Sequence, residues 1–323
     1  MNSLKEIVDI IKKSDNILLT SHIMPDGDSM GSVLGLGMAL ESLSKKVYMV
    51  MEDPIPQLYH FLAGSNRIIS PDSFKENPEL VIFLDCTEYS RAGSGWFEKF
   101  NTDTVIINID HHISNQHFAK INYVDGSAAA TAQIICQILK EMNVPCSQEI
   151  ATALYVGIVM DTGSFKYQNT TPDTLRKAAW LLEQGVDLSF IRENLYENKS
   201  LKSLQVLALA LNNLQVSSDN KIAWTSLSKE ALNELQVKPE HCDGIVNYPI
   251  SITGVQVGLM FRETENNTIK IGLRCRTGRD VNKIANFFGG GGHKLAAGCQ
   301  VDGPLEKAIK QVLEVTRKAL GGS

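Results

Sequence analysis

Apolar runs alternate with amphipathic segments through the first half of the chain. Strand-like runs lie at residues 17–20, 46–52, 81–85, 105–110 and 120–125, and helical spacing of apolar positions lies at 4–13, 29–43, 128–142 and 148–159. Strands that alternate with helices form mostly parallel sheets with helices on their faces. This half of the chain therefore predicts an α/β domain with a doubly wound, mostly parallel sheet.

The pattern changes twice in the second half. Helical spacing runs from 171 to about 214, and the polar segment QVSSDN (215–220) indicates a boundary. Strand-like runs follow at 221–228, 250–263 and 268–276, with helices expected at 281–288 and 305–320. Asn266-Asn267 tolerates the dihedral angles of a turn, so the last two runs predict a β-hairpin. We expect a first domain at 1–190, a helical linker at 191–220 and a smaller α/β domain at 221–320.

Four apolar runs of the first domain end at a carboxylate or an imidazole. His22 follows ILLTS, while Asp85, Asp110 and Asp161 close VIFLD, VIINID and ALYVGIVMD. The carboxyl ends of parallel strands meet at one edge of a sheet, where α/β domains bind their ligands. We therefore expect these side chains to lie close together, although a single aspartate at a strand end is more often a turn or cap residue.

Two further segments place acidic or imidazole side chains side by side. In SHIMPDGDSMGS, the proline and glycine are expected to keep His22, Asp26 and Asp28 in a turn outside any helix, and the alternative is an Asp-Gly turn capped by Ser29. In Asp110-His111-His112, adjacent residues point in different directions. One imidazole can therefore bind metal while the other faces substrate.

Oxygen donors mixed with imidazoles, without a thiolate, suit a pair of divalent ions such as Mn²⁺ or Mg²⁺. Paired ions of this kind activate water for attack on phosphorus. The sequence therefore predicts a two-metal phosphoesterase. The formal net charge of −5 argues against binding of long duplex nucleic acid and is compatible with short phosphorylated substrates.

The second domain carries the local positive charge. Between Arg262 and Lys283 there are six basic residues against three acidic ones, and Arg274 and Arg276 should share one face of a strand. The glycines at 289–292, followed by His293, leave backbone N–H groups free to approach an anion. The alternatives are a flexible hinge and a solvated sheet face.

Several features favour a cytoplasmic protein that is not bound to a membrane. The six cysteines form no CxxC pair and read as reduced thiols. The amino-terminal segment is amphipathic and contains acidic residues, unlike a signal peptide. No apolar run approaches the ~20 residues that span a bilayer.

Five segments together resemble one known family. HIMPDGDS, LDCTEYSR, IDHH and VMDTGSF are similar to the four motifs of the DHH phosphoesterases, and GGGGHKLAAG is similar to the signature of the DHHA1 domain. The size and two-domain plan resemble the NrnA-type subfamily of oligoribonucleases and 3′-phosphoadenosine 5′-phosphate (pAp) phosphatases. The resemblance implies a DHH catalytic domain followed by a DHHA1 substrate-binding domain.

The resemblance also implies a role for each candidate residue. His22 and Asp26 would hold one Mn²⁺, with Mg²⁺ or Co²⁺ as alternatives, and Asp28, His111 and Asp161 would hold the other. Asp85 would bridge the two ions, Asp110 would orient an imidazole, and His112 would contact the scissile phosphate or protonate the leaving oxygen. Substrate contacts would come from Arg91, Arg274, Gly290, Gly291, Gly292 and His293.

The function that this resemblance implies is hydrolysis of short RNA to nucleoside monophosphates, together with dephosphorylation of pAp. A cyclic-di-AMP or pApA phosphodiesterase uses the same two domains and stays open as an alternative. An inactive nucleotide-binding regulator is the alternative from another class, and the intact set of ligands argues against it. The resemblance is also compatible with a homodimer formed through the first domain.

Overall fold

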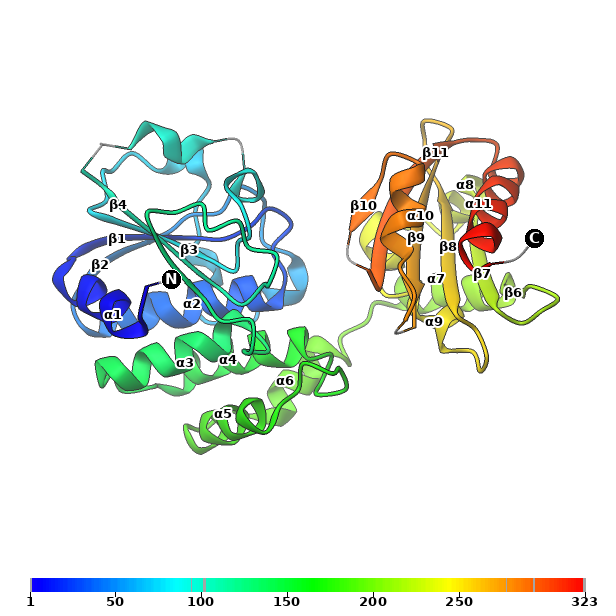
Figure 1. The fold of residues 1–323 in the computed structure, drawn as a ribbon. Helices are drawn as coiled ribbons and strands as arrows, with labels where there is room; N and C mark the ends of the chain where they lie inside the picture. The colour runs from blue at the N-terminus through cyan, green and yellow to red at the C-terminus, as the bar shows by residue number, and fades with distance from the viewer. Residues whose placement is uncertain (1, 94, 101–102, 277, 293, 322–323) are drawn as a thin grey trace. The chain divides into compact units, whose positions relative to one another are not determined.

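The computed structural model describes residues 2–93, 95–100, 103–276, 278–292 and 294–321. The chain forms two compact units, Met1–Asn198 and Lys199–Ser323 (Figure 1). The division falls within the segment expected as a linker, with α6 (Leu188–Leu195) in the first unit and α7 (Leu201–Asn212) in the second. None of the helices in the described ranges has the length and apolar character to cross a membrane.

The first unit contains a five-stranded, wholly parallel sheet in the order β2-β1-β3-β4-β5. The strands are β1 (Asn16–Thr20), β2 (Lys46–Met49), β3 (Leu80–Leu84), β4 (Val105–Asp110) and β5 (Ile121–Val124). The predicted α/β class is confirmed. Strand β1 pairs with β2 on one side and with β3 on the other, so the direction in which strands are added to the sheet reverses between β1 and β3. In such folds, ligands bind beyond the carboxyl ends of the strands at this reversal.

The two faces of this sheet are covered differently. On one face, helices α2 (Gly27–Ser42) and α3 (Thr131–Met142) pack on the strands, with α4 (Gln148–Asp161) behind them and α5 (Pro172–Glu183) behind α4 (Figure 1). Helix α1 (Leu4–Lys13) packs against α3 and β5. On the other face, Phe83 packs with Phe118 and with aromatic side chains of two short 3-10 helices, and Phe74, directly after a third, belongs to the same apolar cluster. These 3-10 helices are η3 (Pro71–Ser73), η4 (Tyr89–Ala92) and η5 (Trp96–Lys99).

The second unit contains a six-stranded mixed sheet in the order β10-β11-β9-β8-β7-β6. The strands are β6 (Gln215–Val216), β7 (Ile222–Leu227), β8 (Val257–Glu263), β9 (Thr268–Cys275), β10 (Gly291–Gly292) and β11 (Ala296–Asp302). Only β7 and β8 pair in parallel. The predicted hairpin between β8 and β9 is confirmed, with Asn267 at a φ of 54° in its turn.

The strand predicted from residue 250 is wrong at its start. Helix α9 (Asn247–Ser251) takes its first two residues, and β8 begins only at Val257. Pro249 suits the first turn of a helix, because a proline has no N–H to donate there. Two short elements before α9, α8 (Lys229–Glu234) and the 3-10 helix η6 (Pro239–Cys242), also escaped the sequence pattern.

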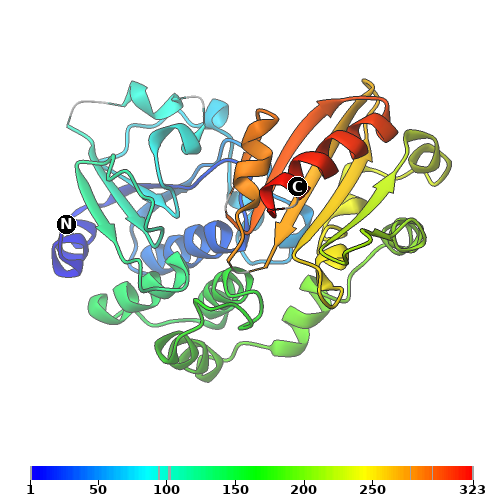
Figure 2. The ribbon, with the colours of Figure 1, turned by 45° about the vertical axis from the view of Figure 1, so that its right-hand side comes forward.

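Helices cover both faces of the second sheet. Helices α10 (Val281–Phe287) and α11 (Leu305–Ala319) lie along one face, on Leu259, Phe261 and Ile271 (Figure 2). On the opposite face, α7 and η6 pack against β7 and against Met260 of β8.

Candidate metal centre

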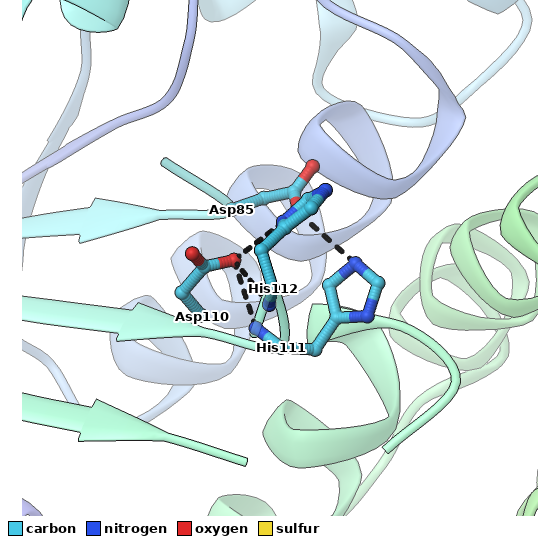
Figure 3. A group of neighbouring side chains, drawn as sticks. All are labelled: Asp85, Asp110, His111 and His112. Carbon is cyan, nitrogen blue, oxygen red and sulfur yellow. Dashed lines mark hydrogen bonds and ion pairs between the residues drawn. The ribbon is translucent and has the colours of Figure 1, made fainter. Parts of the chain in front are cut away.

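The chemistry-bearing residues of the first unit gather where the sheet order reverses. His22 lies two residues after β1, Asp85 directly follows β3, and Asp110 is the last residue of β4, with His111 and His112 next in the chain. Helix α2 contributes Asp28 from its first turn, and Asp161 is the last residue of α4. Figure 3 shows Asp85, Asp110 and the two imidazoles converging from two neighbouring strand ends.

The first donor group consists of His22, Asp26 and Asp85, whose ligand atoms all lie within 4.8 Å of one another. His22 Nε2 is 3.4 Å from Asp85 Oδ2 and 3.8 Å from Asp26 Oδ1. Its Nδ1 lies 2.7 Å from the carbonyl oxygen of Ile23, which places a proton on Nδ1 because a carbonyl oxygen only accepts. Burial lowers the pKa of His22, but its hydrogen bonds to Asp26 and Asp85 outweigh burial and raise it to about 10. A cation bound by this group would take the place of the proton on Nε2.

The prediction that Asp26 and Asp28 lie in a turn outside any helix is wrong for Asp28. Helix α2 already begins at Gly27, and Asp26 is its N-cap, accepting hydrogen bonds from the amides of Asp28 and Ser29 at 3.0 and 3.1 Å. Asp26, and not Ser29, therefore caps the helix. An aspartate at an N-cap satisfies free N–H groups and complements the helix dipole. Glycine destabilises a helix mainly when it lies in the helix interior. Gly27 is the first residue of α2, so it does not prevent the helix from starting there.

The second donor group consists of Asp28, His111 and Asp161, again with ligand atoms within 4.8 Å of one another. His111 Nε2 is 3.3 Å from Asp161 Oδ2 and 3.8 Å from Asp28 Oδ2, while its Nδ1 lies 3.3 Å from the carbonyl oxygen of Ala128. The amides of Thr131 and Ala132, in the first turn of α3, donate to the Asp28 carboxylate at 2.6 and 2.9 Å. These two amides orient Asp28, and neither Thr131 nor Ala132 is among the site residues expected from the sequence.

Asp85 lies between the two groups. Its Oδ2 faces His22, its Oδ1 is 3.6 Å from His111 Nε2, and the Thr131 hydroxyl donates to Oδ1 at 3.2 Å. The residue is 2% exposed and has a φ of 55°, in the left-handed region that few residues other than glycine adopt. Backbone strain of this kind costs on the order of 1–3 kcal/mol and concentrates at functional sites.

Two observations indicate that the residues of the two donor groups are suited to bind divalent cations: a buried imidazole nitrogen, and the raised pKa values of two carboxyl groups. Within the described ranges, His111 Nε2 is buried without a hydrogen-bond partner, which is costly for a polar atom unless another species binds it. Burial, reinforced by the charges of Asp85, Asp161 and Asp26, holds the pKa of Asp28 well above its ordinary value. Burial is also the largest cause that raises the pKa of Asp161 to about 6. Oxygen and imidazole donors in a negative cluster suit Mn²⁺ or Mg²⁺.

His112 lies 3.5 Å through its Nδ1 from Asp85 Oδ1, and Asp85, Asp110, His111 and His112 form a third group whose ligand atoms lie within 4.8 Å of one another. The same Nδ1 lies 2.8 Å from Asp110 Oδ1 (Figure 3). Asn115 donates to Asp110 Oδ2 at 2.5 Å and to the Cys86 carbonyl at 3.0 Å. Burial opposes protonation of His112, but the hydrogen bond to Asp110 and the charge of Asp85 outweigh it and raise its pKa to about 9. The side chain of His112 is 29% exposed, against 12% for His111. His112 is thus the imidazole that other molecules reach more easily.

Asn115 and Thr131 are the orienting residues that sequence reasoning missed. Asn115 follows Asp110 by five residues and lies after the predicted strand, so no periodicity distinguished it. Thr131 begins α3 after three alanines, in a stretch expected to be helical already from 128. The change from AAA to a threonine before an apolar helical pattern was the available signal for a helix start.

The substrate contacts expected from the sequence are divided between the units. Arg91 lies in η4 of the first unit, and its Nε is buried with no hydrogen-bond partner in the part of the chain that the structure describes. Arg274 lies in β9 of the second unit, where its Nη1 donates to the Leu273 carbonyl at 3.0 Å. Arg276 is engaged by the backbone, with its Nε donating to the Val255 carbonyl at 2.7 Å. His293 lies outside the described residues.

The glycine run is only partly an open loop. Gly291 and Gly292 form β10, which pairs with Gly298 and Ala297 of β11. A Cβ at Gly290 would lie 2.2 Å from the Gly298 carbonyl oxygen, so packing alone requires glycine there. The anion-binding role expected for this run stays a prediction.

Comparison with known proteins agrees with this arrangement. Residues 16–158 match the model of the DHH family, N-terminal domain, and residues 219–321 match the DHHA1 domain. The chain is 33% identical over 316 residues to the bifunctional oligoribonuclease and PAP phosphatase NrnA of Thermus thermophilus, covering 97% of this chain and 93% of the relative. It is 28% identical over 300 residues to the Bacillus subtilis protein of the same name, covering 92% of each.

A solved structure is similar over almost the whole chain. It is the crystal structure of an exopolyphosphatase-related protein from Bacteroides fragilis, with a TM-score of 0.91 and 28% identity, covering 98% of this chain and 95% of that one. The two family models and the Thermus thermophilus relative agree with this structural similarity on the family of the chain. The chain belongs to the DHH family and carries the family's DHHA1 domain in its second unit.

Proposed function

We propose that this protein is a metal-dependent phosphoesterase that hydrolyses short oligoribonucleotides to nucleoside monophosphates and dephosphorylates pAp. The observation that carries the proposal is the pair of donor groups on either side of Asp85, whose Oδ2 is 3.4 Å from His22 Nε2 and whose Oδ1 is 3.6 Å from His111 Nε2. The named activities of relatives that match more than nine-tenths of this chain support the choice of substrates.

Two Mn²⁺ ions, or Mg²⁺ or Co²⁺, would be held by the two donor groups. His22, Asp26 and Asp85 would hold one ion, and Asp28, His111 and Asp161 the other, with Asp85 shared. When bound, such ions polarise the phosphate and lower the pKa of water.

The remaining first-unit residues position the substrate and its protons. Asp110 and Asn115 hold the ring of His112, which would donate a proton or a hydrogen bond at the leaving oxygen. Arg91 is proposed to bind a substrate phosphate through its guanidinium, whose buried Nε has no hydrogen-bond partner among the described residues. In the second unit, Arg274, Gly290, Gly291, Gly292 and His293 are proposed to recognise the rest of a short substrate.

The proposed function is tested by assaying the purified chain with Mn²⁺, Mg²⁺ or Co²⁺, and with EDTA, against pAp, pApA, cyclic-di-AMP and RNA strands of increasing length. We expect hydrolysis of pAp and of the shortest RNA, a decline with length, and no turnover in EDTA. Cyclic-di-AMP as the preferred substrate would select the alternative phosphodiesterase. Metal binding without hydrolysis of any substrate would select the inactive regulator.

The hydrogen bonds around Asp110 give a first mutational prediction. Asn115→Ala should lower kcat by about 10- to 100-fold, the usual cost of removing a residue that orients a metal or active-site ligand. Asn115 bonds to Asp110 and to backbone oxygen, so bound metal should be retained. The exposed Asn77→Ala is the matched control. An unchanged kcat for Asn115→Ala would show that the hydrogen bond from Asn115 to Asp110 does not contribute to catalysis.

Arg274 gives a second prediction, measured as a dependence on substrate length. Arg274→Ala should raise KM for dinucleotides and pAp by about 10- to 100-fold, equivalent to the ~1.5–3 kcal/mol of a charged hydrogen bond. The preference for short RNA should flatten, while metal content stays the same. Arg317→Ala, an exposed arginine of α11, provides the control. The wild-type KM and length profile in Arg274→Ala would rule out this role.

A further inference from the structure

Residues 128–132 form a backbone segment that contacts two of the three ligands in the second donor group. The Ala128 carbonyl oxygen lies 3.3 Å from Nδ1 of His111, and two amides of the segment donate to the Asp28 carboxylate at 2.6 and 2.9 Å. A shift of this segment would therefore move both ligands. The third ligand, Asp161, is the last residue of α4, and another side chain joins it to the segment.

That side chain is Asn169, in the loop that follows α4. Its Nδ2 donates to the Asp161 carbonyl oxygen at 3.0 Å and to the Ala129 carbonyl oxygen at 3.1 Å. Both partners are carbonyl oxygens, which only accept, so the amide nitrogen must face them. The last carbonyl groups of a helix have no partner within it, and Asn169 satisfies one that α4 leaves free. One side chain thus links the helix end that carries Asp161 to the segment that holds the other two ligands.

The amide oxygen of Asn169 shows that this side chain is placed by its two donor bonds alone. Within the described ranges, Oδ1 is buried and has no hydrogen-bond partner. Burying a polar atom without a partner is costly. An apolar side chain of similar shape would avoid this cost, but it could not hold the two carbonyl groups together.

The loop between Asp161 and Asn169 has a strained backbone. Gly163, Ser164 and Phe165 have φ values of 56°, 60° and 63°, so three consecutive residues lie in the left-handed region. Residues other than glycine rarely adopt this region, and such strain persists only where neighbouring contacts hold it. The hydrogen bond from Asn169 closes the loop onto the end of α4. Without that bond, we expect relief of the strain to displace the last turn of α4 and the carboxylate that it carries.

We infer that Asn169 is a positioning residue for the ion of the second donor group. It acts through the backbone of Asp161 and Ala129, and it keeps the Asp161 carboxylate beside the other two ligands. Hydrogen bonds behind metal ligands fix their orientation, and losing one usually weakens metal binding by about 10- to 100-fold. The inference rests on the proposed function, because it takes the two ions from that proposal.

The test is a titration of the full-length chain with Mn²⁺, followed by electron paramagnetic resonance, which distinguishes a single Mn²⁺ from a magnetically coupled pair. The wild type should bind two ions and give the signal of the pair. Asn169→Ala should bind one ion as the wild type does and the other about 10- to 100-fold more weakly, so that the single-ion signal persists to higher Mn²⁺ concentrations. Gln168→Ala, at the exposed neighbouring position of the same loop, should match the wild type.

Two further variants identify the donor group and separate hydrogen bonding from packing. His111→Ala removes a ligand of the second group, so adding Asn169→Ala to it should not weaken the remaining ion further. Asn169→Leu keeps a side chain of similar shape without a donor, so it should weaken the same ion as Asn169→Ala does. Thermal unfolding in EDTA shows that each variant folds. Because Asn169 contacts none of the proposed ligand side chains, saturating Mn²⁺ should restore turnover in both single variants.

Three results would overturn the inference. The first is wild-type affinity for both ions in Asn169→Ala and Asn169→Leu. The second is further weakening of the remaining ion when Asn169→Ala is added to His111→Ala. The third is turnover that stays low in Asn169→Ala after both ions have bound. Failure of the proposed function would appear differently, as a wild type that binds fewer than two ions or that hydrolyses no substrate with both bound.

Discussion

Asp85→Ala should abolish hydrolysis of every substrate and remove metal from both donor groups. The two oxygens of Asp85 face His22 on one side and His111 on the other, so a single substitution takes a ligand from each group. We expect turnover to fall by more than about 10³-fold, since removing a single charge-stabilising donor already costs about 10²–10³-fold. Metal content per chain, measured by mass spectrometry of the purified protein, should fall together with activity.

A second substitution separates the charge of Asp85 from its backbone conformation. Alanine at a φ of 55° adds strain of roughly 1–2 kcal/mol, whereas asparagine tolerates the left-handed region. Asp85→Asn should therefore fold like wild type and still lose metal and turnover. Asp72→Ala, in the exposed part of η3, serves as the control for aspartate removal. Full metal content and full turnover in Asp85→Asn would show that the ligand assignment is wrong.

The metal centre could be predicted because it depends on strand ends. Asp85 and Asp110 end short apolar runs typical of buried strands, and parallel strands bring such ends to one edge. The helix start at Gly27 could not be predicted with the same confidence, because Pro25 and Gly27 are turn residues in most contexts. Asp26 caps the helix locally, and in addition the Asp28 side chain is held by amides of α3, more than 100 residues away in the chain, which no local pattern predicts.

The second unit was less predictable because its chemistry depends on strand register. The hairpin around Asn266-Asn267 follows from local turn preference. Gly272 and Gly298 lie opposite each other because of the register in which β11 pairs with β9, and no local sequence pattern predicts that register. Likewise, a run of glycines has no side-chain periodicity, so the short strand β10 left no signal in the sequence.

Replacing each of the two adjacent histidines should impair the protein in a different way: one substitution should remove metal, and the other should lower turnover while metal is retained. His111 Nε2 faces Asp28 and Asp161 from within the second donor group, so His111→Ala should lose metal from that group. His112 is bonded through Nδ1 to Asp110 and is the more exposed ring, so His112→Ala should retain both metals. Its turnover should still fall by roughly 10²–10⁴-fold, the contribution of a general acid or a positioning group.

The pair of variants contains its own control, since both remove one imidazole from consecutive positions of the same strand end. Metal content and kcat should be measured on the same preparations, with thermal unfolding in the presence and absence of Mn²⁺ as a third readout. A ligand that binds only the folded state raises its stability by RT ln(1 + [L]/Kd). Mn²⁺ should therefore stabilise His112→Ala as much as wild type and His111→Ala less. If His112→Ala instead lost metal as severely as His111→Ala, both imidazoles would be ligands, and the proton at the leaving oxygen would have to come from another group.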